Sequence, residues 1–434
     1  MKDQEGALIR LHPGAIKHLK NGHPWITQDC FTQKYPKNAA ILNAKINGQF
    51  FIFLHDPDHP HIKARLWKKT DAGNEVSLNF EKELEYKLHQ AFSKRSPNLF
   101  VQRQNIYLAF GENDEIPGLH ILFLAGTILL QDYTTGLWAQ RRELLVRLIP
   151  KVFKQVFENI PEEKPSYQAM LYQQRHKGEN QGRPFIAWDG DLSHQLLSGT
   201  PLQVQEFGLI YQLRFDAGHD FGLYCDMSAI RHILINSFKN VLSFLNLFSY
   251  TGAFTLFAFS QGAREGCSID LSPKYMDWLE LNLKNNQQQF QNVQHTSIIK
   301  PVSEGLKKIK QEMRKFDLII CDPPTFSSDG DKRKNHFGAA SELLVKMYEL
   351  LNPKGKIILF NNTHKIGRQK FEQLVREEIR QQNLRLKLER SLSLNQDCPR
   401  LKGFPEGDYL KGVILVKDRD SNSSSVSPAF KISS

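Results

Sequence analysis

The segment from residue 318 to residue 326 reads LIICDPPTF and places an acid at the end of an apolar run. Such a run predicts a buried strand. Asp322 can accept hydrogen bonds from an amine. Pro323 and Pro324 have no N–H, so the turn cannot join a helix and its carbonyl groups are left for a ligand. The segment therefore predicts a ligand site at a strand end.

Two earlier strand ends carry groups suited to a nucleotide. Gly252, in NLFSYTGAFT, permits a tight turn and the close approach of a ligand, toward which the following helix directs its first N–H groups. A plain turn is the alternative. Asp270 ends the next run and can accept hydrogen bonds from both hydroxyls of a ribose. Its alternative role is a helix cap, but Ser272 and Pro273 already supply one.

Further side chains extend this expected site. Phe326 offers an aromatic face on which a base could stack, with a place in the core as the alternative. Asn361 and Asn362 end the fifth apolar run, and their amides can donate and accept. Cys321 precedes Asp322 within the strand, so we interpret it as a packing residue.

The elements that would position these groups follow from the texture of the chain. From about Val241, continuous apolar runs alternate with amphipathic segments, which predicts a parallel, doubly wound sheet. Residues 8–67 are short β-like pieces interspersed with lysines and predict a small basic barrel or sheet. Residues 78–100 have helical spacing, and strands and an amphipathic helix follow them. The Ser-rich residues from Asp418 predict a disordered tail.

Composition narrows the class of protein. The chain has 434 residues and a formal net charge of +11, which favours a polyanionic partner, although a merely basic enzyme is the alternative. Its five cysteines are scattered without a Cys-x-x-Cys pair, which argues against a disulfide framework or a zinc site and for the cytoplasm. Residues 240–263 carry no charge, but polar residues interrupt them, so we expect no membrane span.

Several segments together resemble one family, the class I S-adenosylmethionine-dependent rRNA methyltransferases of the group containing the 23S rRNA enzymes RlmI and RlmK. The matching segments are FLNLFSYTGAFT, CSIDLSPKYMDWLELNLKNN, FDLIICDPPTFS, GKIILFNN, DFGLYCDMSAIR, GENDEIPGLHI and FPEGDYLKG. LHPGAIKHLKNGHPWI is similar to the start of a PUA-type RNA-binding domain. The chain departs from the family after the third strand, where IIKPVSEGL offers Ser303 or Glu304 for the adenine, and at Met227 and Ser228.

The resemblance implies a fold and a division into domains. The fold is α/β, with a Rossmann-like, mostly parallel methyltransferase sheet over residues 189–417. A PUA-like β-barrel over residues 1–75 and a small α+β (EEHEE-like) linker domain over residues 76–188 precede it, and residues 418–434 form the tail.

It also implies residues for each role and S-adenosylmethionine as the cofactor, with no metal. The catalytic set is Asp322, Pro323, Pro324 and Asn361. The cofactor-binding set is Tyr224, Asp226, Ser249, Tyr250, Thr251, Gly252, Asp270, Leu271, Ser303 and Asp322. The RNA-binding set is Lys17, Lys20, Trp25, Arg65, Arg231, Phe326 and Asn362. The expected partner is 23S rRNA or a large-subunit precursor, with no membrane, and a homodimer is an option.

Chemistry favours one target atom. Methylation of cytosine C5 needs a thiolate that adds at C6, and the cytosine members of this group carry a cysteine where this chain has LFNNTHK. Guanine N7 has its own lone pair and needs only positioning. We therefore expect methylation of guanine N7. The alternatives are cytosine C5, through Cys225, Cys321 or Cys398, a non-catalytic ribosome-assembly factor and a small-molecule methyltransferase.

Overall fold

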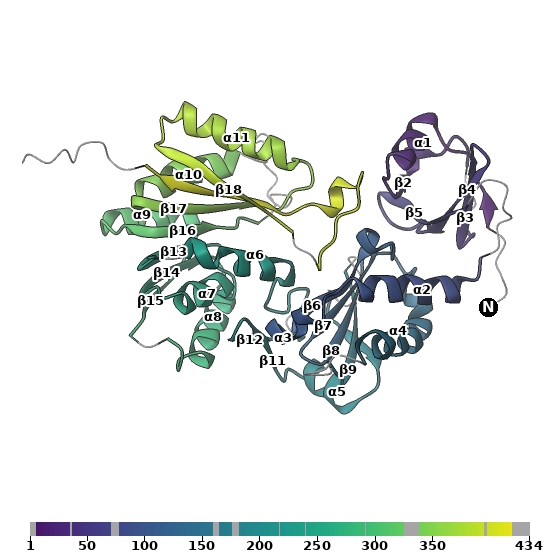
Figure 1. The fold of residues 1–434 in the computed structure, drawn as a ribbon, viewed down its shortest axis with the longest axis horizontal. Helices are drawn as coiled ribbons and strands as arrows, with labels where there is room; N and C mark the ends of the chain where they lie inside the picture. The colour runs from purple at the N-terminus through teal and green to yellow at the C-terminus, as the bar shows by residue number, and fades with distance from the viewer. Residues whose placement is uncertain are drawn as a thin grey trace, which may run out of the picture. The chain divides into compact units, whose positions relative to one another are not determined.

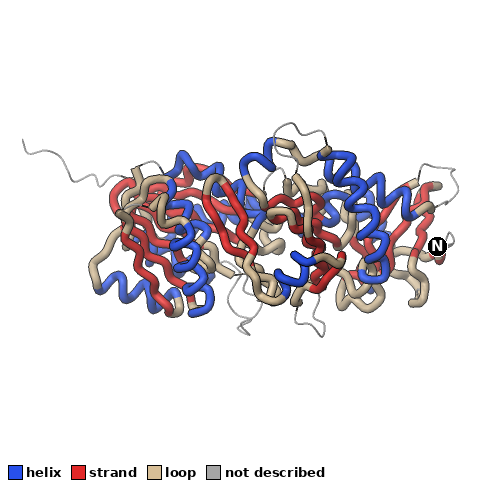
Figure 2. The backbone as a smooth tube through the Cα atoms, turned by 90° about the horizontal axis from the view of Figure 1, so that it is seen from below, coloured by secondary structure: helices blue, strands red, loops and turns tan. Residues whose placement is uncertain are grey.

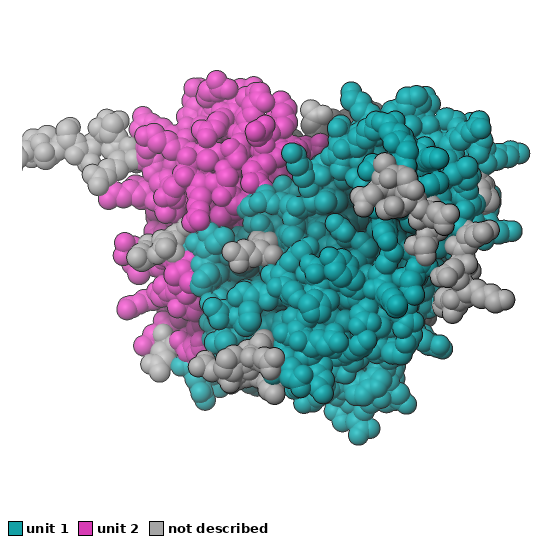
Figure 3. Space-filling view, turned by 45° about the vertical axis from the view of Figure 1, so that its right-hand side comes forward, with its two compact units in different colours: residues 1–234, 278–288, 393–409 teal, residues 235–277, 289–392, 410–434 magenta. Residues whose placement is uncertain are grey.

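A computed structural model provides the structure of the chain. It describes residues 6–34, 37–70, 78–158, 165–175, 182–216, 218–238, 240–290, 292–324, 338–394 and 397–418. The chain groups into two compact units (Figure 3). Unit 1 comprises Met1–Leu234, Trp278–Gln288 and Ser393–Tyr409, and unit 2 comprises Ile235–Asp277, Gln289–Leu392 and Leu410–Ser434.

Unit 1 begins with a five-stranded sheet of order β1-β3-β4-β5-β2. Its elements are β1 (Ala7–Leu8), α1 (Pro13–Lys20), β2 (Trp25–Thr27), β3 (Ile41–Ile46), β4 (Gln49–His55) and β5 (Ile62–Lys69). Helix α1 has proline at its first position, where no N–H is needed, and the His12 side chain accepts a hydrogen bond from Gly14 N. Its buried Leu19 joins the core that the sheet forms with Ile26, Leu42 and Phe53.

A second five-stranded sheet in unit 1 has the order β10-β9-β8-β7-β6. Figure 1 labels four of its strands, β6 to β9. Its strands are β6 (Asn105–Phe110), β7 (Leu119–Leu124), β8 (Thr127–Asp132), β9 (Ala169–Gln174) and β10 (Phe185–Trp188). Helices α2 (Phe80–Ser93) and α4 (Arg142–Phe157) contribute Leu88, Phe92, Leu145, Ile149 and Phe153 to the core above it. The helix expected within 78–100 is present as α2, which ends at Ser93, and the strands that follow it are confirmed.

The rest of unit 1 consists of short elements, the part of helix α8 (Pro273–Asn285) from Trp278 onward, and a returning segment. The short elements are α3 (Asn98–Gln102), α5 (Asp191–Leu197), β11 (Leu202–Glu206), β12 (Leu209–Leu213) and α6 (Ser228–Ile233). We call residues 397–409 the strap, because they contact several earlier segments. The Asp397 carboxylate lies 2.7 Å from Arg103, the Phe404 ring packs edge-on against Trp25 at 4.7 Å, and the Tyr409 hydroxyl donates to Asp226. Asp397 also accepts a hydrogen bond from Tyr107 N of β6, so the strap connects both sheets of unit 1.

Unit 2 contains a seven-stranded sheet of order β15-β14-β13-β16-β17-β19-β18. Its strands are β13 (Ser243–Leu247), β14 (Glu265–Asp270), β15 (Gln294–Ile299), β16 (Phe316–Cys321), β17 (Leu351–Asn361), β18 (Leu386–Ser393) and β19 (Lys411–Lys417). The pairs from β15 through β17 are parallel, and β19 runs antiparallel beside β17. The expected doubly wound sheet is confirmed, with an antiparallel strand added.

Helices cover both faces of this sheet. They are α7 (Ala253–Ser260), α9 (Val302–Gln311), α10 (Gly338–Glu349) and α11 (Arg368–Gln381), and they alternate with strands along the chain. Figure 2 shows helices in blue beside the strands in red. Apolar residues of α9, α10 and α11 share one core with Leu247, Ile319 and Leu359. On the other face, Phe254 of α7 stacks on Phe360. The sheet is therefore buried on both faces, as its continuous apolar strands require.

Two expectations meet the limits of the described residues. No described helix is both long and apolar enough to cross a membrane. Phe326 and residues 419–434 of the expected tail lie outside the described residues. The PUA-like character of the first sheet and the division into three domains stay predictions.

Candidate active site at the carboxyl end of the sheet

Strand register brings the predicted groups to one edge of the seven-stranded sheet. Leu247 of β13 pairs with Ile269 of β14 on one side and with Cys321 of β16 on the other. Asp270 and Asp322 each follow one residue later. Because neighbouring strands lie about 4.8 Å apart, the backbone positions of two residues that flank β13 are separated by roughly 10 Å across the sheet. This edge, where β13 has neighbours reached by opposite crossovers, is where ligands bind in open α/β sheets.

The turn between β13 and α7 is tight and strained. Gly252 adopts φ +83° directly before α7, a conformation that costs a residue with a Cβ. Phe248 and Tyr250 also have positive φ, +57° and +50°. Such outliers tend to gather where a backbone must approach a ligand. Ser249 and Thr251 are buried in this turn, and Tyr250 is partly exposed with its ring 4.5 Å from that of Tyr275.

Asp270 joins this turn to the next helix. Its Oδ2 accepts a hydrogen bond from Tyr250 N at 2.9 Å, and its Oδ1 accepts one from Ser272 N at 3.0 Å. The predicted cap is confirmed, because the Ser272 hydroxyl accepts from Tyr275 N. A carboxylate has about four acceptor positions, so these two bonds leave capacity for hydroxyl groups. Leu271 is exposed beside it, and Ser303 is exposed at the start of α9.

Asp322 and two asparagines lie at the ends of β16 and β17. Asn362 Nδ2 donates to Asp322 Oδ1 at 3.1 Å. Among the described residues, buried Oδ1 of Asn362 has no hydrogen-bond partner. Asn361 is 7 % exposed, and its Oδ1 accepts from Thr363 N at 3.2 Å, so its amide nitrogen is the donor it can offer. Pro323 is buried and Pro324 exposed in the turn after β16.

The environments of the four buried cysteines favour packing over a nucleophilic role. Cys321 is fully buried at the end of β16, and burial and the Asp322 charge raise the pKa of its thiol. Burial raises the pKa of Cys267 to about 11 and also raises the pKa values of Cys225 and Cys398. A thiol with a raised pKa is poor in the thiolate that nucleophilic attack requires. The interpretation of Cys321 as a packing residue agrees with this environment.

Three predicted residues of unit 1 belong to the segment before β13. Tyr224 is 49 % exposed, whereas Asp226 accepts a hydrogen bond from the Tyr409 hydroxyl. Burial raises the pKa of Asp226, and among the described residues its Oδ1 has no hydrogen-bond partner. Arg231 is 1 % exposed, and its Nε lies 2.6 Å from Glu206. A buried, paired guanidinium supports a structural role for Arg231 more than the predicted contact with RNA.

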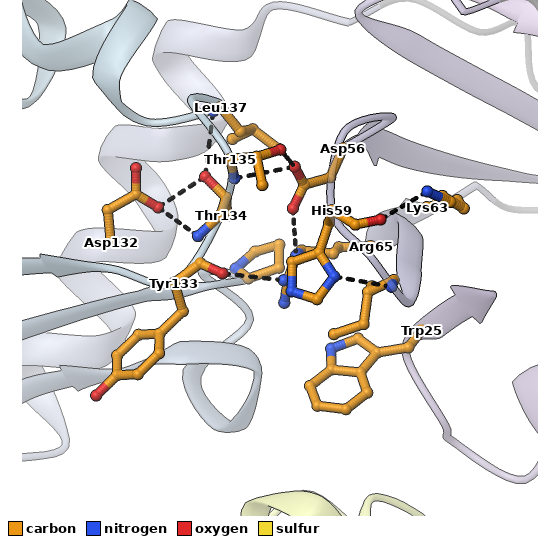
Figure 4. A network of polar contacts seen from close by, with 12 residues as sticks. Trp25, Asp56, His59, Lys63, Arg65, Asp132, Tyr133, Thr134, Thr135 and Leu137 are labelled. Atoms are coloured by element: carbon orange, nitrogen blue, oxygen red, sulfur yellow. Dashed lines mark hydrogen bonds and ion pairs between the residues drawn. The ribbon is translucent and has the colours of Figure 1, made fainter. Parts of the chain in front are cut away.

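The predicted RNA-binding residues of the first sheet differ in exposure. Lys17 and Lys20 lie on the exposed face of α1. Arg65 instead is 2 % exposed and binds Asp56, Glu112 and the carbonyl of Tyr133. Figure 4 shows how Asp56 also accepts from the backbone of Thr135, so this network ties β5 to the segment after β8. Trp25 donates to the same Glu112 at 2.7 Å. Of these predicted residues, the two lysines of α1 are therefore exposed and Arg65 is not.

Sequence reasoning missed two residues, one in each unit, that bond to segments distant in the sequence. Lys411 is 2 % exposed, and its ammonium donates to the carbonyls of Thr363 and Ile366. Tyr409 holds Asp226 from the strap. For Lys411, the available signal in the sequence was its place directly before the apolar run GVILV. A charge that is buried at such a position needs hydrogen-bond partners.

The chain's groups at the sheet edge fit a nucleoside with a charged tail. Asp270 offers acceptors for a ribose, Gly252 admits a close ligand, and the N-terminus of α7 favours negative charge. S-adenosylmethionine has such a ribose and a carboxylate, and when bound it supplies an electrophilic methyl group. Ser249, Tyr250, Thr251, Gly252 and Asp270 are the residues of this edge that would hold it.

Comparison with known proteins agrees with this arrangement. A curated relative from Aeromonas salmonicida, ribosomal RNA large subunit methyltransferase I, is 25% identical over 94% of this chain and 98% of its own length. A ribosomal RNA large subunit methyltransferase of Deinococcus radiodurans is 23% identical over 94% and 97%. A solved structure from Streptococcus mutans, described as a SAM-dependent methyltransferase, has 19% identity and a TM-score of 0.75, and covers 94% of this chain and 100% of its own.

The match to a protein family is broader than any single motif. The family described as S-adenosylmethionine-dependent methyltransferase matches residues 158–401, which is more than half of the chain. A further solved methyltransferase, in complex with SAH, also has a TM-score of 0.75 and covers 94% of this chain. The chain belongs to the S-adenosylmethionine-dependent methyltransferases.

Proposed function

We propose that this methyltransferase modifies a base of large-subunit ribosomal RNA, and that the base is a guanine methylated at N7. The observation that carries the RNA substrate is the full-length similarity to two proteins named as ribosomal RNA large subunit methyltransferases. The net charge of +11 and the exposed Lys17 and Lys20 support a polyanionic partner.

The proposal for N7 depends on the sheet edge. Covalent catalysis at cytosine C5 needs a thiolate, and the cysteines of this region are buried with raised pKa values. The end of β17 carries Asn361 and Asn362 instead. Because Oδ1 of Asn361 is already bonded, its amide nitrogen can donate to an acceptor. Guanine presents two acceptors, N7 and O6, on one edge.

The proposed mechanism is positioning. The first and second sheets of unit 1 bind the RNA through its phosphates and shape. The target base then leaves its stack. Asp322 accepts from the N–H groups of the guanine, Asn361 donates to its O6, and Asp270 holds the cofactor ribose. Asn362 keeps the Asp322 carboxylate in place. N7 then needs only to face the methyl group in line.

The testing experiment is incubation with tritiated S-adenosylmethionine and undermethylated ribosomal RNA, followed by nucleoside mass spectrometry. A methylguanosine that elutes as the N7 isomer is the expected product. A methylcytosine would overturn the N7 proposal and favour the alternative reaction through a cysteine. Absence of label, with the cofactor bound in calorimetry, would favour the non-catalytic assembly factor. The cytoplasm and a homodimer stay predictions.

A further inference from the structure

A buried cation lies beside the last residue of β17, and the proposed mechanism does not use it. Lys411 opens β19 and pairs with Asn361 in the antiparallel register of β17 and β19. It is 2 % exposed. Taking an ammonium group out of water costs several kcal/mol unless it is well paired. A chain that keeps this group buried therefore gains something from its hydrogen bonds.

Two hydrogen bonds of Lys411 go to the backbone of one loop. Its Nζ donates to the carbonyl of Thr363 and, at 2.8 Å, to that of Ile366. We call residues 361–366 the β17 loop. Within this loop, Thr363 N donates to Asn361 Oδ1, and Lys365 N donates to the Thr363 hydroxyl at 3.3 Å. The ammonium thus bonds to both halves of this loop, whereas the bonds of Thr363 N and Lys365 N stay within it.

The same loop supplies the partner of the proposed catalytic acid. Asn362 lies between Asn361 and Thr363 and donates to Asp322 Oδ1 at 3.1 Å. Displacement of the Thr363 carbonyl would therefore move the amide that holds Asp322 and the amide proposed to hold the base. A shift of about 1 Å at such groups can cost about a hundredfold in rate.

We propose that Lys411 is a positioning residue for methyl transfer, which acts through the β17 loop by holding Asn361 and Asn362 against Asp322 and the substrate. This inference rests on the proposed function for the role of Asp322. Its structural half, the restraint of the loop by the ammonium, stands without it.

The chain offers a matched control on the same strand. Lys417 ends β19, and its Nζ also donates to a backbone carbonyl, that of Leu351 at 3.0 Å. Leu351 opens β17, so this contact lies at the opposite edge of the sheet. Lys411→Met and Lys417→Met therefore remove the same group from one strand, near the proposed site and far from it.

The experiment compares both variants with the wild type by hydrogen exchange and by methyl-transfer kinetics. In Lys411→Met we expect the amides of Thr363 and Lys365 to exchange at least ~10-fold faster and kcat to fall by ~10- to 100-fold. The melting temperature should change little, because methionine fills the volume without a buried charge. Lys417→Met should leave both the exchange and kcat within about twofold of wild type.

The outcomes separate the inference from the proposed function. A folded Lys411→Met protein with unchanged loop exchange and unchanged kcat would overturn the inference. Faster exchange in a protein whose wild type methylates no RNA would contradict the proposed function while supporting the restraint. If Lys411→Met does not fold, Lys411→Arg retains the charge, and its loss of kcat should disappear in an Asn362→Ala background. Additive losses in that double variant would contradict action through Asn362.

Discussion

The two ends of the seven-stranded sheet carry the same three kinds of residue. At the amino end, Asn352 Nδ2 donates to Asp317 at 2.8 Å, and Lys417 donates to the Leu351 carbonyl. At the carboxyl end, Asn362 Nδ2 donates to Asp322, and Lys411 donates to the Thr363 and Ile366 carbonyls. Composition alone cannot distinguish these two ends.

Their partners distinguish them. Asp317 also accepts from the backbone N–H of Leu242 and Ser243 and from the Ser243 hydroxyl, so it joins the first residues of β13, β16 and β17. At the carboxyl end, Asp270 and Asp322 bond to groups in loops that follow the strands. The bonds of Asp317 join strands of the sheet, and the bonds of Asp270 and Asp322 position loops. We infer that the role of a polar pair is indicated better by the elements that it links than by the residue types that form it.

The largest expected difference is in turnover. Asp322→Ala should lower kcat by about a thousandfold, because it removes a group placed to contact the reacting base. The melting temperature should stay within about 2 °C of wild type, since the pair with Asn362 is partly exposed. Transfer of tritium to ribosomal RNA measures the first quantity and calorimetric unfolding the second. Full turnover with unchanged cofactor affinity would remove Asp322 from the site.

The amino-end variant should show the opposite pattern. Asp317→Ala leaves the N–H groups of Leu242 and Ser243 without their carboxylate partner, which should cost about 2–3 kcal/mol of unfolding free energy. Its kcat should remain within about threefold of wild type, because no loop of the carboxyl end depends on it. Urea unfolding and the same tritium assay check both. A fall in kcat of more than about threefold in a folded variant would show that the two ends are coupled.

The same variant gives a pH test. Burial raises the pKa of Asp317, but hydrogen bonds from Asn352, Ser243 and Leu242 outweigh it and leave the pKa lowered. A carboxyl whose folded pKa lies below its unfolded value stabilises the protein above that unfolded value, about 3.9. This contribution is lost as the pH falls through the folded pKa. The stability difference between wild type and Asp317→Ala should therefore be constant from about pH 5 to 7 and shrink below about pH 4. A difference that does not change down to pH 2 would contradict the lowered pKa.

The smallest expected effect is at Cys321. Cys321→Ala removes a buried thiol and should cost about 1 kcal/mol of stability, with kcat within about threefold of wild type. Nucleoside mass spectrometry on this variant should yield the same product as the wild type. Complete loss of product in a folded protein would instead make the thiol a nucleophile and favour cytosine C5.

Much of the sheet edge could be predicted from the sequence, because strand ends and turns are encoded locally. The apolar run before Asp322, the glycine turn at Gly252 and the cap at Ser272 each depend on a few adjacent residues. Strand register then brings these ends together. Local pattern was sufficient wherever the positioning element was itself continuous in the sequence.

Long-range partners could not be predicted in this way. Arg65 and Arg231 read as exposed basic residues, yet each is buried against a glutamate from a distant segment, Glu112 or Glu206. Lys411 is paired with a loop that precedes it by about 45 residues. No periodicity or turn signal marks such pairs, because their partners are set by tertiary packing alone. The segment FDLIICDPPTFS likewise contains no signal that Asp317 bonds to Leu242 and Asn352.

The discontinuity of the two compact units has a consequence for synthesis on the ribosome. Unit 1 is completed by Ser393–Tyr409, and unit 2 needs β19, which pairs with β17 in the interior of its sheet. Until β19 emerges, the apolar strand β17 presents an unpaired edge that can associate with other chains. Domains usually fold in order during translation at about 5–20 residues per second, whereas the sheet of unit 2 cannot close until β19 is made. Premature termination after β17 would therefore yield an incomplete, aggregation-prone sheet rather than a smaller active enzyme.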